Sequence, residues 1–183
     1  MALHKLLLPI FLLVSIIDLA IGQADLNPER FAFEPELAYN EDIQSPSEFL
    51  GYELGESFTL YANATAYFQY LAQSSDRVVM KSYGETYEGR KLYTVVISSP
   101  QNLANIDELK AANLELGDPR TISAGRAEDI IRDKPVFVSY SYNIHGNEAS
   151  GTEAALQVSY RFAAAEDEET EDVLAQVKAK LGW

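Results

Sequence analysis

The sequence predicts an α/β protein: a mixed sheet with helices on both faces and one edge of the sheet left open. Two observations lead to this fold class. Three segments alternate apolar and polar residues with the period of a strand: 77–83, 91–98 and 135–144. Four segments place apolar residues at helical spacing: 59–73, 103–116, 150–165 and 166–180. Each helix and the sheet must bury an apolar face against another element, so we expect layers of helix and sheet.

The first 22 residues are predicted to be a secretory signal peptide. Lys5 supplies the positive charge, and residues 6–17 form an apolar run of 12 residues. Ala20-Ile21-Gly22 provides the small residues of a cleavage site. An uncleaved membrane anchor is the alternative, but the run is short against the roughly 20 residues that a span needs. We therefore expect a secreted or periplasmic protein with no stable membrane insertion after cleavage.

Residues 23–55 are predicted to be an extended lead-in. They contain Pro28, Pro35 and Pro46 and show no sustained apolar period. Within them, residues 45–52 are expected to form either a turn or one turn of helix. Residues 56–183 then supply the predicted sheet and its helices.

Charge and cysteine content exclude several classes of protein. The chain has 28 acidic and 14 basic residues and a formal net charge of −14. Such an acidic chain argues against binding to nucleic acid or to anionic membranes. It has no cysteine, which excludes a disulfide scaffold, thiol chemistry and a cysteine metal site.

The first helix and the first two strands form a continuous unit. In the helix at 59–73 the apolar residues recur at helical spacing, and the segment 84–90 joins the two strands as a hairpin-like connection. Gly89 suits a position with positive φ. Arg90 resembles a clamp for a substrate carboxylate, but we expect it to pair with Glu85 or Glu88 instead.

Two helices are predicted between the second and third strands. In the segment 103–116, Asn105 followed by Glu108 fits an N-cap and its third residue. Gly117-Asp118-Pro119 stops this helix. A short helix is expected at 127–131.

Two further helices follow the third strand. Ser150 and Glu153 match a capping box at the start of the helix at 150–165. The helix at 166–180 has acidic residues at its start and lysines at its end, as the helix dipole favours. Its apolar stripe contains Val173, Val177 and Leu181.

The third predicted strand leads into a turn that presents a histidine and a glutamate. The strand covers residues 135–144, and His145 and Glu148 follow it at a spacing of three. Ligand sites in open α/β sheets lie outside the carboxyl ends of strands. An imidazole and a carboxylate both suit zinc, which often takes two His and one Glu together with a water. By itself, a lone His near a strand end is more often a hydrogen-bonded structural residue.

Two stretches give the sequence a specific resemblance to a known family. The segment Asn143-Ile144-His145-Gly146-Asn147-Glu148-Ala149-Ser150-Gly151 resembles the first metal-binding motif of the zinc carboxypeptidases. Its His-Gly-Asn-Glu form is similar to the carboxypeptidase E/N and bacterial branches. The segment 83–93 is similar to the family's Gly-x-(Ser/Thr)-x-Glu-Gly-Arg turn between the first two strands. The long interval of residues 99–134 points to a bacterial long-form branch.

The resemblance implies a function and a site. It implies a secreted, zinc-dependent metallocarboxypeptidase that hydrolyses C-terminal bonds of peptide or protein substrates, with His145 and Glu148 as two of three protein ligands to Zn²⁺. The family's second zinc-binding His, its catalytic Glu and its substrate-binding residues match no position here. We therefore expect residues 56–183 to be the N-terminal part of the catalytic domain, with no catalytic residue in this fragment.

Two other functions stay open at this point. One is a zinc amidohydrolase or deacylase of the related group. The signal peptide and the turn at 83–90 both argue against it. The other is a non-catalytic secreted binding module with the same fold. A later His and a later Glu in the family's order would favour catalysis, and their absence would favour binding.

Overall fold

The computed structural model describes residue 34 and residues 36–182, with side chains as far as Gln176. The chain divides into two compact units, Met1–Glu36 and Leu37–Trp183, and the description here concerns the second. The predicted signal peptide lies outside the described residues. None of the helices in the described part has the length and apolar character that crossing a membrane requires.

The second unit contains seven helices and four strands among the described residues. In chain order they are α2 (Pro46–Leu50), α3 (Tyr61–Ser74), β1 (Val78–Glu85), β2 (Lys91–Ile97), α4 (Pro100–Ala104), α5 (Ile106–Gly117), α6 (Ala124–Asp133), β3 (Val136–Ser141), α7 (Ala149–Ala164), α8 (Glu168–Gln176) and β4 (Val177–Gly182).

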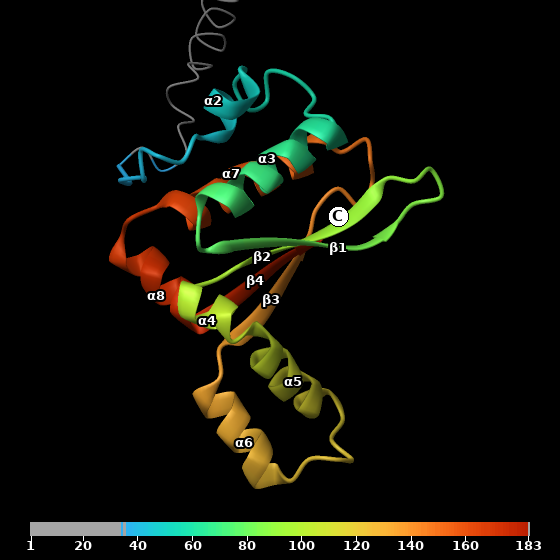
Figure 1. Ribbon diagram of the computed structural model, residues 1–183, viewed down its shortest axis with the longest axis vertical. Helices are drawn as coiled ribbons and strands as arrows, with labels where there is room; N and C mark the ends of the chain where they lie inside the picture. The colour runs from blue at the N-terminus through green and yellow to red at the C-terminus, as the bar shows by residue number, and fades with distance from the viewer. Residues whose placement is uncertain (1–33, 35, 183) are drawn as a thin grey trace, which may run out of the picture. The chain divides into compact units, whose positions relative to one another are not determined.

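The strands form one mixed sheet, as the sequence predicts. The order is β1-β2-β4-β3. β1 pairs with β2 and β2 with β4 in antiparallel fashion, whereas β3 and β4 are parallel. Figure 1 shows α3 and α7 on one side of this sheet and α5 and α6 on the other. The predicted fold class, a mixed sheet with helices on both faces, is therefore confirmed.

The hairpin between β1 and β2 forms where the sequence places it. Thr86 N–H donates to Arg90 O at 2.8 Å, and Gly89 N–H donates to Thr86 O at 2.9 Å. Gly89 has φ 77°, the positive value predicted for it. The pairing register shifts between Ser82 and Gly84, which places a bulge in β1 beside the turn.

The main core lies between the sheet and the helix pair α3 and α7. α3 packs against β1 and α7 against β2. The largest fully buried apolar side chains come from α3, β2 and α7: Tyr67, Phe68, Leu71, Val95, Ile97 and Leu156. Each such burial contributes about 1.5–3 kcal/mol. Burial raises the pKa of Tyr67 far above its ordinary value, and its hydroxyl donates to Gln44 O at 3.0 Å.

The described part of the lead-in is packed against this core. Asn40 N–H donates to Ala164 O at 2.8 Å, and the Tyr39 ring stacks on Tyr160 with 4.8 Å between centroids. Of the two alternatives for residues 45–52, the structure has the turn of helix, α2, which begins at a capping box formed by Ser45 and Glu48.

One predicted helix is divided and one predicted cap is absent. The helix expected at 103–116 is two helices, because Asn105 lies between α4 and α5 with φ −105° and ψ 19°. Asn105 precedes α5 as expected but makes no side-chain capping bond. The capping box of Ser150 and Glu153 is wrong: α7 already begins at Ala149, so Ser150 is inside the helix.

The helix predicted at 166–180 is wrong in its second half. α8 ends at Gln176, and Val177–Gly182 is the strand β4. This strand lies between β2 and β3 and pairs with both. The sequence Val177-Lys178-Ala179-Lys180-Leu181 also alternates with period two. Pairing with two neighbouring strands stabilises the strand here, although Val173, Val177 and Leu181 have helical spacing.

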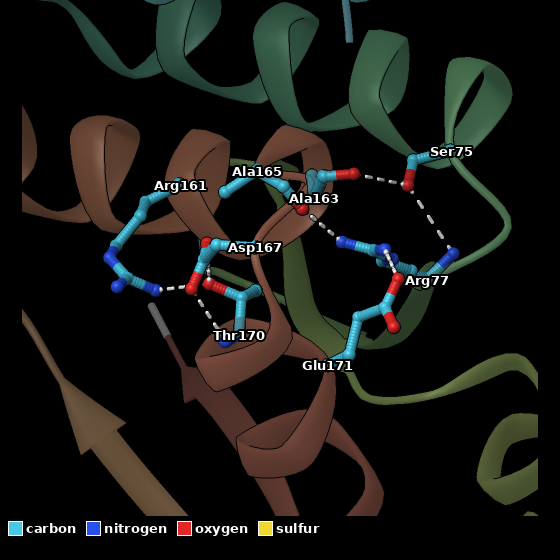
Figure 2. Close-up of polar contacts among 8 residues, drawn as sticks. All are labelled: Ser75, Arg77, Arg161, Ala163, Ala165, Asp167, Thr170 and Glu171. Atoms are coloured by element: carbon cyan, nitrogen blue, oxygen red, sulfur yellow. Dashed lines mark hydrogen bonds and ion pairs between the residues drawn. The ribbon is translucent and has the colours of Figure 1, made fainter. Parts of the chain in front are cut away.

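A polar network holds the corner where α7 passes into α8 (Figure 2). Arg77 Nη1 donates to Ala165 O at 2.6 Å, and Ser75 Oγ donates to Ala163 O at 2.9 Å. Thr170 N–H donates to Asp167 Oδ1 at 2.9 Å, which caps the first turn of α8. Hydrogen bonds from the Thr170 side chain and backbone lower the pKa of Asp167. The end of α7 is thereby fixed to the start of β1.

Candidate metal-binding site

The turn with the two predicted ligands follows the carboxyl end of β3. β3 ends at Ser141, so the strand stops three residues before the predicted end at Ile144. Asn143 has φ 53°, a left-handed conformation that a strand cannot continue through. His145 consequently lies four residues beyond the end of β3, within the turn, and Glu148 lies at the start of α7.

Backbone hydrogen bonds organise this turn. Glu148 N–H donates to His145 O at 3.0 Å, and Gly151 N–H donates to Glu148 O at 3.2 Å. Glu148 occupies the N-cap position of α7 but makes no side-chain capping bond. Its carboxylate therefore makes no hydrogen bond to the backbone at the start of the helix. A negative charge at the positive end of a helix is also favourable.

Both side chains are exposed to solvent. His145, Gly146, Asn147 and Glu148 all lie at the surface. The alternative, a structural histidine packed into the protein, would require a buried side chain and a hydrogen-bond partner. In their exposed positions the imidazole and the carboxylate are accessible to a metal ion.

The donor chemistry fits zinc, but the number of donors is small. An imidazole and a carboxylate are both ordinary zinc ligands. Among the described residues, no group of three or more His, Cys, Asp or Glu side chains could hold a metal ion. A catalytic zinc site uses three protein ligands and keeps one open position. His145 and Glu148 can therefore supply part of such a site.

A shallow groove of about 280 Å³ adjoins the turn. Its lining is mostly apolar and comes from the start of α3 and the β1–β2 hairpin, with Asn143 and Gly146 at the side of the turn. Arg90 also lines it, and its guanidinium lies 2.7 Å from Glu88 Oε2. This agrees with the expected pairing of Arg90 with a neighbouring glutamate rather than with a clamp for substrate.

Stacked tyrosines precede the turn. The rings of Tyr140 and Tyr142 lie 6.2 Å apart between centroids with an interplanar angle of 20°. Burial raises the pKa of Tyr142, and the nearby Tyr140 raises it further. Two aromatic rings thus lie side by side directly before Asn143.

One long-range contact of α7 has no signal in the sequence. Glu153 Oε1 accepts a hydrogen bond from Thr59 N–H at 3.1 Å, across a separation of 94 residues. This bond ties the second turn of α7 to the segment before α3. The pattern of Ser150 and Glu153 suggests a local cap, and nothing in it points to a partner so distant in the chain.

Comparison with known proteins agrees with the resemblance seen in the sequence. The family model for zinc carboxypeptidase matches residues 64–181, which include both motifs. Among solved structures, the chain is similar to the carboxypeptidase A from Helicoverpa armigera, with 16% sequence identity and a TM-score of 0.43. That alignment covers 78% of this chain and 27% of the other, so this chain spans little more than a quarter of that relative. No curated protein matches the sequence.

Proposed function

Because the chain belongs to the zinc carboxypeptidase family, we propose that it is part of a secreted zinc-dependent metallocarboxypeptidase. Its substrates are peptides or proteins, from which it removes C-terminal residues. The observation that carries the proposal is the turn between β3 and α7. There His145 and Glu148 are exposed in one hydrogen-bonded turn, inside the range that the family model matches.

Each of the two residues has a defined role in this proposal. The His145 imidazole and the Glu148 carboxylate hold the zinc ion as two of its three protein ligands. When bound, zinc lowers the pKa of a water toward about 7 and polarises the substrate carbonyl. The carboxylate offsets part of the metal's positive charge. The turn restrains both ligands, and their exposed side leaves room for substrate and for the third ligand.

Zinc binding by the chain tests these roles directly. The chain has two histidines, His4 and His145, so the imidazole signals in an NMR titration with Zn²⁺ are few, and His145→Ala assigns them. We expect Zn²⁺ to shift the His145 signals, and Glu148→Gln to weaken the binding by at least about tenfold. Glu128→Gln, which removes an exposed carboxylate on α6, is the matched control and should leave the affinity unchanged.

Two results would contradict the assignment. A His145 signal that does not respond to Zn²⁺ would remove it as a ligand. Equal effects of Glu148→Gln and Glu128→Gln would show that Zn²⁺ is held by the general acidity of the surface rather than by this turn.

Export is part of the same proposal and has its own test. It rests on Lys5, the apolar run of residues 6–17 and the small residues before Gln23. N-terminal sequencing of the exported protein should start near Gln23. An exported protein that keeps Met1 would rule out cleavage of this segment.

A non-catalytic binding module with the same fold is the second candidate. It would need only the fold and not a complete set of metal ligands, and the described residues hold no group of three or more possible metal ligands. The gene that encodes this chain can be read for a further His and Glu in the family's order. Finding both would favour the enzyme over the binding module.

A further inference from the structure

Asn143 and Gly151 meet at the base of the turn that carries His145 and Glu148. A Cβ atom added to Gly151 would lie 2.7 Å from Asn143 Oδ1 and 3.1 Å from Asn143 N. Real Cβ atoms essentially never come as close as the first distance, and the second is tighter than most. A Cβ at Gly151 would therefore force the Asn143 side chain to move and its backbone to give by a few tenths of an ångström.

The contact is steric rather than a hydrogen bond. Asn143 Oδ1 is buried and accepts no hydrogen bond from the described residues. Gly151 is the third residue of α7, where most other residues would favour the helix more. Close approach to Asn143 is a physical reason for a glycine at this position.

The backbone of Asn143 adds a second constraint. Its φ of 53° turns the chain away from the direction of β3. Asparagine adopts this left-handed conformation more readily than most residues. The chain therefore reverses at Asn143, passes through His145 and Glu148, and returns to contact Asn143 again at Gly151.

We propose that Asn143 and Gly151 are positioning residues that close the metal-binding turn at its base. Neither holds the metal; they hold the turn in which Glu148 N–H donates to His145 O at 3.0 Å and Gly151 N–H donates to Glu148 O at 3.2 Å. The inference rests on the proposed function, in which this turn binds zinc. A turn that is ordered before metal binding avoids the entropy loss of ordering it afterwards, and groups that orient ligands commonly change metal affinity by ten- to a hundredfold.

Four variants of the full chain test this inference. Gly151→Ala places a Cβ against Asn143, and Asn143→Gly removes the contacted side chain while keeping access to positive φ. The double variant combines both changes. Gly125→Ala is the matched control, because Gly125 also lies in the first turn of a helix, α6, and an added Cβ there meets nothing within 4 Å.

Two measurements are made on each variant: hydrogen exchange of the Glu148 amide without metal, and Zn²⁺ affinity from the His145 NMR signals. For Gly151→Ala we expect about tenfold faster exchange at Glu148 and about tenfold weaker Zn²⁺ binding. Amides of β1 and β2 should keep their exchange rates. Gly125→Ala should change neither quantity.

The double variant isolates the contact itself. Gly151→Ala should have a smaller effect on both quantities in the Asn143→Gly background than in the natural chain, because the 2.7 Å contact is then gone. Some effect should persist, since the Asn143 backbone nitrogen stays near the new Cβ. Strictly additive effects would overturn the proposed contact.

The exchange measurement also separates this inference from the proposed function. If the natural chain shows no Zn²⁺ response at His145, the proposed function fails, and the exchange rates alone decide the positioning role. Unchanged exchange at Glu148 in Gly151→Ala, or an equal acceleration throughout β1 and β2, would overturn that role.

Discussion

Arg77 is the side chain that fixes the far end of α7, the helix that begins at the turn with His145 and Glu148. Its Nη1 donates to Ala165 O at 2.6 Å, and its side chain is only 17% exposed. The carbonyls in the last turn of a helix lack partners within the helix and carry a partial negative charge. A buried cation is well placed to satisfy them. Glu171, at 3.6 Å and 65% exposed, is a weaker partner.

Replacing Arg77 should therefore cost more than replacing its acidic partner. We expect Arg77→Met to lower the free energy of unfolding by about 2 kcal/mol, because it leaves a buried carbonyl without its charged donor. Glu171→Gln should cost less than about 0.5 kcal/mol, since exposed ion pairs contribute little. Urea unfolding of both variants measures this. Equal losses of unfolding free energy in the two variants would mean that the ion pair with Glu171 stabilises the fold, and not the hydrogen bond to Ala165 O.

At the scale of elements, α2 shows how a short helix can persist at the surface of the core. It has only five residues, too few for a stable isolated helix. Its capping box supplies the missing partners: Ser45 N–H donates to Glu48 Oε2 at 2.8 Å, and Glu48 N–H donates to Ser45 Oγ at 3.3 Å. The hydrogen bond from the Ser45 backbone, and then that from its hydroxyl, lower the pKa of Glu48.

This lowered pKa gives α2 a predictable pH dependence. A carboxyl whose pKa is lower in the folded state stabilises that state above its ordinary pKa of 4.5, and the stabilisation is lost as the pH falls through the folded value. The difference in unfolding free energy between the natural chain and Glu48→Gln should be below about 1 kcal/mol at neutral pH, since the pair is exposed. Urea unfolding across the acid range should show this difference shrinking. A difference that stays constant would exclude the capping carboxylate as its source.

The elements that could be predicted are those whose local pattern agrees with their surroundings. α3 and the β1–β2 hairpin have clear periods and a turn glycine at Gly89, and local and tertiary preferences coincide there. The segment 166–182 fits two periods at once. Its second half is a strand because it pairs with β2 on one side and with β3 on the other. The spacing of apolar residues within the segment does not indicate these partners.

At the scale of the whole molecule, the turn between β3 and α7 has some features that the sequence indicates and others that only the packing of elements sets. His145 and Glu148 could be proposed as ligands from the sequence because they are close in the chain and form a motif. Two contacts near this turn could not be predicted: Thr59 bonds to Glu153 across 94 residues, and the approach of Asn143 to Gly151 depends on how β3 meets α7. Such contacts are set by the packing of elements, which a single sequence does not display.

The whole chain of 183 residues should lack carboxypeptidase activity on its own. Hydrolysis by this chemistry needs three protein ligands to zinc and a general base within reach of the attacking water. His145 and Glu148 supply two ligands, and the described residues bring no third donor beside them. With a short peptide and added Zn²⁺, mass spectrometry should detect no release of C-terminal residues above that of Zn²⁺ alone. Zinc-dependent release that His145→Ala abolishes would contradict this expectation, because it would mean that the chain completes the site by itself, with a ligand and a base drawn from its own residues.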